Sequence, residues 1–239
     1  MAHEHTSNSK KYLPFEQDGK IYNLYDLPKG FVIKGDLHLY HQNLTELPDL
    51  SDVVVKGNFD CFDNELTSLE GAPKEVGGNF SCFGNRLTSL EGAPKTVGGY
   101  FSCSCNQLTS LEGAPQKVSG DFYCDYNRLT SLDGASIVVG GDFYCESNQL
   151  TSLVGVPQVK NGKTIICDDS IGDKYGFSDS SYSGIPYEDL CKSPLYRSEE
   201  AMNRVRIKQQ QEQMQQQQEK INAEFSQWLK NNANKPTRE

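Results

Sequence analysis

Apolar and polar residues alternate over short stretches in the middle of the chain, and this pattern repeats every 21 residues. Beginning at Val76, the unit reads Val-Gly-Gly-x-Phe-x-Cys-x-x-Asn-x-Leu-Thr-Ser-Leu-Glu-Gly-Ala-Pro-x-x. Its most regular apolar positions are Phe59, Phe80, Phe101, Phe122 and Phe143, then Cys61, Cys82, Cys103, Cys124 and Cys145, then Leu66, Leu87, Leu108, Leu129 and Leu150. A fixed period of this length indicates a solenoid, in which each unit buries its apolar face only against its neighbours.

Within each unit, the segment Phe-x-Cys-x-x-Asn-x-Leu predicts one short strand followed by a turn. Alternate strand residues face opposite sides, so the Phe and Cys positions point inward, and the Asn side chain can satisfy backbone groups at the turn. The seven expected parallel strands are centred near Leu37, Phe59, Phe80, Phe101, Phe122, Phe143 and Ile165. Proline in the return segments removes backbone donors, which favours an extended or turn-like convex side without helices. The paired glycines are expected to form the tight turn into each strand.

Changes in composition divide the chain into five predicted segments. These are an N-terminal cap at 1–23, the solenoid at 24–167, an irregular C-terminal cap at 168–197, a glutamine-rich helix at 198–231 and a disordered tail at 232–239. Ser198 is a favourable N-cap for that helix. The residues expected to cover the two ends of the stack are Tyr12, Leu13, Phe15, Ile21 and Tyr22, and then Tyr175, Phe177, Tyr182, Ile185 and Tyr187.

The glutamine-rich helix carries a narrow apolar stripe. Apolar residues recur every seven positions at Ile207, Met214, Ile221 and Trp228. The second core position of each heptad is occupied by Gln211, Gln218 and Phe225, so only the last of these is apolar. A strict coiled coil needs both positions apolar. Three interpretations remain open: a solvated or disordered tail, weak self-association as a coiled coil, and docking of the stripe onto a partner or onto the solenoid.

The Leu-Thr-Ser-Leu and Asn-x-Leu spacing resembles the short bacterial leucine-rich repeats of the IpaH and YopM effector families. The Glu-Gly-Ala-Pro-Lys-x-Val-Gly-Gly variant at 70–78 and 91–99 also resembles repeat proteins of bacteria and large tailed phages. The resemblance covers about residues 24–167 and implies the α/β-solenoid class, mostly β: a leucine-rich repeat solenoid of about seven short parallel strands, followed here by a C-terminal helix.

IpaH-type effectors carry a large helical ubiquitin-ligase domain after the repeats, and this chain continues for only some seventy residues. Their Cys-x-Asp motif has matches at Cys61 and Cys167, but both cysteines stand at the inward strand position. Packing explains these matches, so no ligase activity is expected.

The eight cysteines follow the repeat rather than a disulfide or zinc pattern. Cys-x-x-Cys spacing, which zinc sites use, is absent, and free Cys packs as a small hydrophobe. A buried ladder of reduced thiols predicts a cytoplasmic setting, in the protein's own cell, in a host cell or after delivery into another cell. The first residues lack the apolar stretch of a secretory signal, and no run is long enough to span a membrane. No metal or cofactor is expected.

The net negative charge of the chain indicates which classes of binding partner are favoured. The chain has a net charge of −9, and residues 57–159 contribute twelve acidic against five basic side chains, a net of −7. An acidic surface repels phosphate backbones, so direct nucleic-acid binding is disfavoured and a protein with a basic surface is favoured. The same balance could serve solubility alone.

Residues between the inward positions vary from unit to unit and gather aromatic and acidic side chains on the expected concave face. The candidate partner-binding residues are Asp60, Phe62, Phe83, Tyr100, Asp121, Tyr123, Asp125, Asp142, Tyr144 and Glu146. Tyr and Phe are common in strands anyway, but exposed aromatic residues beside carboxylates are typical of protein interfaces. The candidate tail contacts are Ile207, Met214, Ile221, Phe225 and Trp228.

These features predict a non-catalytic protein-binding module, such as a phage or bacterial modulator or inhibitor of a host protein. One alternative is a structural component that self-assembles through its C-terminal helix. Another is an inhibitor that mimics nucleic acid and occupies the basic groove of a DNA- or RNA-binding protein. Catalysis is not expected: Cys105 has no nearby cation to activate it, and a metal site at His38, His41 and Asp60 is disfavoured against simple solvation.

Overall fold

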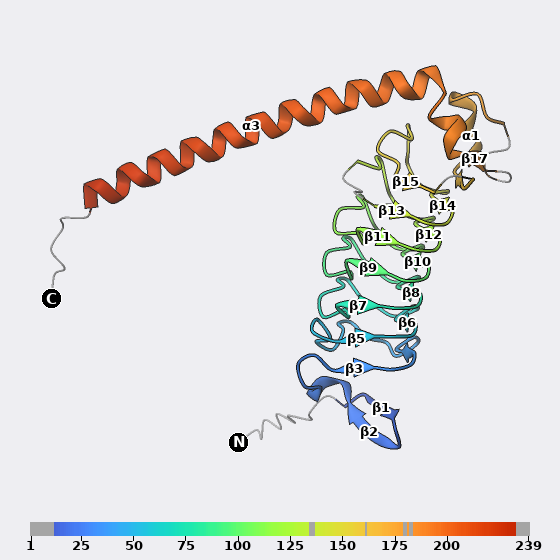
Figure 1. Ribbon diagram of the computed structural model, residues 1–239, viewed down its shortest axis with the longest axis vertical. Helices are drawn as coiled ribbons and strands as arrows, with labels where there is room; N and C mark the ends of the chain where they lie inside the picture. Colours follow the sequence, from blue (N-terminus) through green and yellow to red (C-terminus); the bar gives the residue numbers. More distant parts are fainter. Residues whose placement is uncertain (1–11, 134–136, 161, 179–180, 182–183, 233–239) are drawn as a thin grey trace, which may run out of the picture. The chain divides into compact units, whose positions relative to one another are not determined.

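Seven short parallel strands, joined at one end by an antiparallel eighth, form one sheet of a mostly-β solenoid (Figure 1). The computed structural model describes residues 12–133, 137–160, 162–178, 181 and 184–232. Its seven parallel strands are β4 (Leu37–His38), β6 (Phe59–Asp60), β8 (Phe80–Ser81), β10 (Phe101–Ser102), β12 (Phe122–Tyr123), β14 (Phe143–Tyr144) and β16 (Thr164–Ile166). All seven lie at the predicted positions, and each pairs with its neighbour in exact 21- or 22-residue register. We call each strand of this sheet, with the loop that follows it, a row.

A second parallel sheet lies on the return side of the solenoid and was not predicted. Its described strands are β3 (Val32–Ile33), β5 (Val54–Val55), β7 (Glu75–Val76), β9 (Thr96–Val97), β11 (Lys117–Val118), β13 (Val138–Val139) and β15 (Gln158–Val159). Each of these strands has only two residues, too few to show alternation in the sequence. They pair because the first sheet already holds successive turns in register. The expected extended, non-helical return side is therefore ordered more regularly than predicted.

The core is a column of identical side chains. All five repeated Phe residues are fully buried, and the rings of successive turns lie 5.1–5.4 Å apart. The Cys position forms a parallel column of buried free thiols, in which Cys82 and Cys103 donate to the carbonyl oxygens of Ser102 and Tyr123, each at 3.3 Å. Burial raises the pKa of these thiols, so the protonated form is favoured, as expected for a column of reduced cysteines that point inward.

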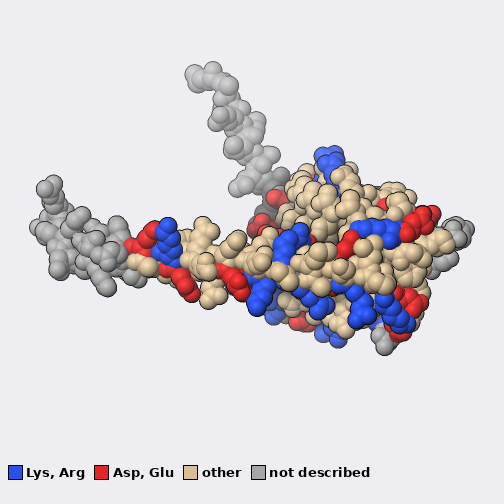
Figure 2. Space-filling model, turned by 90° about the horizontal axis from the view of Figure 1, so that it is seen from above, with Lys and Arg blue, Asp and Glu red and all other residues tan. Residues whose placement is uncertain are grey.

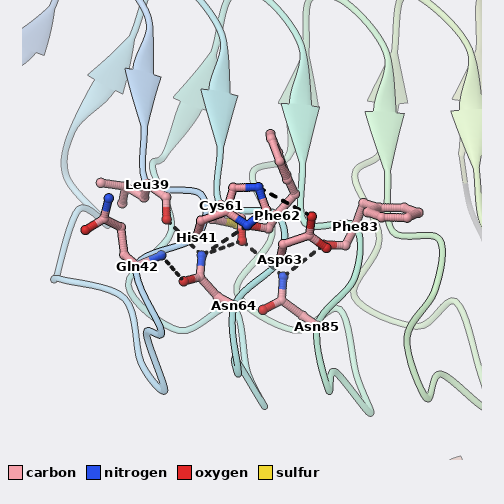
Figure 3. A network of polar contacts seen from close by, with 9 residues as sticks. All are labelled: Leu39, His41, Gln42, Cys61, Phe62, Asp63, Asn64, Phe83 and Asn85. Atoms are coloured by element: carbon pink, nitrogen blue, oxygen red, sulfur yellow. Dashed lines mark hydrogen bonds and ion pairs between the residues drawn. The ribbon is translucent and has the colours of Figure 1, made fainter.

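In the five rows from β6 to β14, an asparagine lies at the point where the chain turns after the strand. Figure 3 shows two successive members, Asn64 and Asn85. In the central member, Asn106 Oδ1 accepts the N–H of Leu87 at 2.9 Å, and Nδ2 contacts the carbonyl oxygens of Cys82 and Cys103 at 3.0 Å. Because the side chain joins its own row to the preceding one, it satisfies buried backbone groups that no strand partner reaches. The predicted role of this Asn is confirmed.

A two-stranded hairpin covers the N-terminal end. β1 (Pro14–Gln17) and β2 (Lys20–Asn23) pair antiparallel and lead into a 3₁₀ turn at Leu24–Asp26. The Gln17 side chain pairs with the backbone of β3 as a neighbouring strand would. Its Nε2 donates to Val32 O at 3.2 Å, and its Oε1 accepts a hydrogen bond from Lys34 N at 2.7 Å.

Only some of the residues expected in this cap contribute to it. Phe15 and Tyr22 stack on each other at 5.3 Å and both contact the Phe31 ring. Tyr12 and Ile21 are each 66% exposed, so their predicted role in the cap is wrong. Ile21 is an exposed position of β2, and Tyr12 precedes the first strand of the hairpin.

The C-terminal cap is more regular than the predicted irregular segment. It contains α1 (Asp169–Lys174), β17 (Ile185–Pro186) and α2 (Tyr187–Leu190), and β17 pairs antiparallel with β16. The expected capping residues Tyr175 and Ile185 are buried, and the Tyr175 hydroxyl accepts Leu153 N at 3.0 Å. Tyr182 lies outside the described residues.

The glutamine-rich helix belongs to a second compact unit of the chain. The boundary between the two units lies between Ser193 and Pro194. This helix, α3, runs from Pro194 to Asn232, so it begins four residues before the predicted start at Ser198. Proline is favoured at the first helical position because the N–H that it lacks has no helical partner there. Ser198 is therefore a residue of the helix, not its cap. Residues 233–239 of the predicted tail lie outside the described chain.

Figure 2 shows acidic and basic side chains interspersed with uncharged ones along α3. The apolar stripe is solvent-exposed where the structure describes it: Ile207 is 36%, Met214 71%, Ile221 50% and Phe225 58% exposed. The side chain of Trp228 lies outside the described residues. Among the described residues, no helix combines the length and apolar character needed to cross a membrane.

Candidate functional site

The outward side of the β4–β16 sheet, which we call the outer face, carries all ten candidate partner-binding residues. Each of them reaches solvent, and none is fully buried. Phe83 is 38% exposed, and the other nine are half-buried: Asp60, Phe62, Tyr100, Asp121, Tyr123, Asp125, Asp142, Tyr144 and Glu146. Six of them belong to two groups of neighbouring side chains, one over the first two rows and one over the later rows.

The first group, the aromatic cluster, consists of Tyr40 and Phe62 together with His38 and His41. The Tyr40 and Phe62 rings stack at 4.7 Å with 12° between their planes. The His41 and Phe62 rings, both drawn in Figure 3, lie 5.5 Å apart and nearly perpendicular to each other. His38 Nδ1 lies 2.8 Å from Asp60 Oδ2. Tyr40 and His41 were not among the candidate partner-binding residues, although the position of Tyr40, three after Leu37, is the position of Phe62 three after Phe59.

A metal site in this region is not supported by the geometry. His41 Nε2 lies 3.8 Å from Asp63 Oδ2, so each histidine contacts a carboxylate of the next row. Across the described residues, no three His, Cys, Asp or Glu side chains converge as a metal site requires.

The second group, the acidic–tyrosine cluster, consists of Tyr100, Tyr123, Tyr144, Asp125 and Glu146. Tyr123 and Tyr144 stack at 4.5 Å, and Tyr100 meets the edge of Tyr123 at 5.9 Å. Asp125 and Glu146 occupy the same position in successive rows. Within the described part of the chain, neither of these two carboxylates has an ion-pair partner.

Crowding and burial perturb the carboxylates of this cluster. Burial, together with the charges of Asp125, Asp168 and Asp169, raises the pKa of Glu146. Burial also raises the pKa of Asp125, against the effect of the hydrogen bonds it accepts from Glu146 N and Ser104 Oγ. Burial, together with the charges of Asp121, Asp142 and Asp125, raises the pKa of Tyr144, so its phenol stays neutral. The cluster therefore holds negative charge at a cost to the folded state, and a cation placed there would relieve it.

Replacing Glu146 with glutamine is expected to stabilise the protein at pH 7, by about 0.5 kcal/mol or less because the side chain is largely solvated. The pKa of Glu146 is higher in the folded than in the unfolded state, so its ionised form opposes folding at neutral pH. As the pH falls through the folded pKa, protonation relieves this opposition and the difference between variant and wild type disappears. Urea midpoints at pH 7 and pH 4 measure it. Glu91→Gln, an exposed change away from the outer face, is the control, and an equal gain at both pH values for Glu146→Gln would contradict the assignment.

Two of the candidate carboxylates also have a structural function that the sequence did not reveal. Asp121 Oδ1 accepts Asp142 N and Asp142 Oδ1 accepts Thr164 N, both at 2.8 Å. Asn58 and Asn79 make the same bond to the following row. The remaining oxygen of Asp121 accepts the hydroxyl of Tyr123. Substituting Asp121 or Asp142 would therefore disturb the stacking of rows, and Glu146 is the better residue for a test of binding.

Cys105 lies beside the acidic–tyrosine cluster in a left-handed backbone conformation, with φ at 56°. Burial, together with the charges of Asp125 and Asp63, raises its pKa. The thiolate is the reactive form of cysteine, so this environment disfavours a nucleophilic role. The predicted inert thiol is consistent with these surroundings.

The outer face thus combines stacked rings with carboxylates, a combination suited to holding a cationic side chain. Comparisons of the chain with protein-family models, with curated proteins and with solved structures gave no match, so the proposal that follows rests on the geometry of the chain itself.

Proposed function

We propose that this protein is a leucine-rich repeat recognition module that binds a partner protein with a basic surface through its outer face. The repeat assignment is supported by the buried Phe, Cys and Leu columns and by the Asn side chains that bridge successive rows. The six buried free thiols of the column are stable in a reducing compartment, which favours action inside a cell. In this role the protein would modulate or inhibit its partner without catalysis.

The acidic–tyrosine cluster is the observation that carries the proposal. Asp125 and Glu146 have raised pKa values, which means that the folded protein retains unfavourable negative charge on its surface. Beside them, Tyr123 and Tyr144 present a stacked pair of rings to solvent. Tyrosine provides a large contact area at low entropic cost, and carboxylates steer a basic partner toward the interface.

Replacing Glu146 with lysine is expected to reduce capture of the partner about tenfold or more, because a like charge is then placed against its basic surface. The lysine should be tolerated by the fold, since it joins a cluster of carboxylates. The measurement is quantitative mass spectrometry of proteins captured from bacterial lysate by wild type and variant. Glu91→Lys makes the same charge change on an exposed return segment and is expected to capture as wild type does.

A truncation at Ser193 separates this function from any function of α3, because α3 begins at Pro194. Residues 1–193 should retain the partner. Equal capture by Glu146→Lys and Glu91→Lys, or loss of the partner only on truncation, would contradict recognition by the outer face.

Self-association through α3 is the second candidate function, and the exposed stripe of Ile207, Met214 and Ile221 favours it. Under this proposal, light scattering of the full chain reports a mass that grows with concentration, whereas residues 1–193 stay monomeric. Ile207→Ser with Ile221→Ser should abolish the growth, and Gln209→Ser with Gln216→Ser, on the polar side of the helix, should not.

A further inference from the structure

We propose that the aromatic cluster binds an arginine side chain of the partner, with the guanidinium against the solvent-accessible parts of the Tyr40 and Phe62 rings. The carboxylates of Asp60 and Asp63 would lie at its edge. This inference rests on the proposed function and adds the chemical identity of the side chain that the first rows of the outer face would recognise.

The rings are available for such a contact. Tyr40 is 39% exposed, Phe62 is half-buried, and Phe83 in the next row is 38% exposed. Figure 3 shows the Phe62 and Phe83 rings pointing in different directions, so they do not cover each other. A protein gains nothing in solubility from three such side chains in adjacent rows, and a cluster of this kind marks a binding surface.

The charge beside the rings selects a cation. Asp63 is the more accessible carboxylate, with 42% of its side chain exposed, and Asp60 is 15% exposed. Within the described residues their ion-pair contacts are with His41 and His38, and no lysine or arginine pairs with either. A carboxylate has about four acceptor sites, so one imidazole contact leaves capacity for further donors.

Arginine fits this combination better than lysine does. The guanidinium is planar, stacks on aromatic faces and presents donors in a fork that matches a carboxylate. The ammonium of lysine is a compact and strongly hydrated charge that gains little from stacking. The acidic–tyrosine cluster would attract either cation, whereas the aromatic cluster would discriminate between them.

The test measures binding of fluorescein-labelled hexa-arginine and hexa-lysine peptides to the full chain by fluorescence anisotropy at one fixed salt concentration. Wild type is expected to bind the arginine peptide about three to ten times more tightly than the lysine peptide. Tyr40→Leu with Phe62→Leu should lower the arginine affinity to that for lysine while leaving lysine binding unchanged. Tyr126→Leu, at an exposed tyrosine outside both clusters, should preserve the preference. Circular dichroism and urea midpoints establish that each variant is folded.

The outcomes separate this inference from the proposed function. Equal binding of the two peptides by wild type, or a preference for arginine that survives in the Tyr40/Phe62 variant, overturns the arginine site. In that case, loss of affinity for both peptides in Glu146→Lys would still support recognition of a basic partner by the acidic–tyrosine cluster. Failure of both peptides to bind wild type overturns both the arginine site and the preference for a basic partner.

Discussion

Asn106→Ala is expected to lower the free energy of unfolding by about 3–5 kcal/mol, because it leaves several buried backbone groups without partners at about 1–3 kcal/mol each. The side chain is only 8% exposed. Its Oδ1 accepts a hydrogen bond from the N–H of Leu87, and its Nδ2 donates to the carbonyl oxygens of Cys82 and Cys103. Water cannot replace these bonds without opening the stack between two rows. Urea unfolding followed by circular dichroism measures the loss.

Two companion variants make this prediction specific. Gln107→Ala changes the adjacent side chain, which is half-exposed, and is expected to alter stability by no more than about 0.5 kcal/mol. Asn106→Asp keeps the shape and the acceptor but places a carboxylate oxygen against two carbonyl oxygens. It should therefore destabilise at least as strongly as alanine. A well-tolerated Asn106→Asp would show that the donor half of the amide contributes little.

The bonds of Asn106 also explain why a solenoid needs a polar residue in its core. Each row can bury its Phe and Cys against the next row, but the chain must then turn away from the sheet and leaves backbone groups unpaired. One asparagine amide in each of the five central rows meets this need, since an amide both donates and accepts hydrogen bonds. The residue therefore recurs at Asn64, Asn85, Asn127 and Asn148 with the same set of bonds.

The repeat allowed the first sheet to be predicted because the inward positions are occupied by Phe and Cys in five successive turns and by apolar residues at the two ends. The second sheet could not be predicted in the same way. A segment such as Glu75–Val76 has one buried residue and no alternation, and it becomes a strand only when its neighbours are already aligned. The start of α3 was missed for a different reason: Ser198 is a favourable N-cap residue, whereas the helix begins at Pro194, a residue favoured at the first helical position.

The candidate site was predictable in its position but not in its internal bonding. The alternation of inward and outward residues in the strands predicted that Asp121 faces away from the core. The sequence could not show that one carboxylate oxygen of Asp121 accepts a hydrogen bond from Asp142 N and the other from the Tyr123 hydroxyl. The aromatic cluster was only half recognised, because Phe62 was among the candidate partner-binding residues and Tyr40 was not. Its first row belongs to a degenerate unit in which Leu37 replaces Phe, and the match to the repeat is weaker there.

Phe101→Ala is expected to cost about 3–5 kcal/mol, the usual range for removing a fully buried Phe side chain. Its ring is completely buried and lies 5.2 Å from both Phe80 and Phe122. Because each turn of a solenoid packs only on its neighbours, a cavity in a central turn weakens both interfaces of that turn. Chemical unfolding measured by circular dichroism should show a lower midpoint, and a shallower transition would show that the two halves have begun to unfold separately.

Phe101→Leu distinguishes filled volume from ring stacking as the source of this stability. Leu37 and Ile165 already occupy the same position in the first and last rows of the parallel stack, and both are buried. An aliphatic side chain is therefore compatible with this backbone, and leucine at position 101 should cost about 1.5 kcal/mol or less. If leucine destabilises as much as alanine, the contacts between rings, rather than the filling of the core, hold the successive turns together.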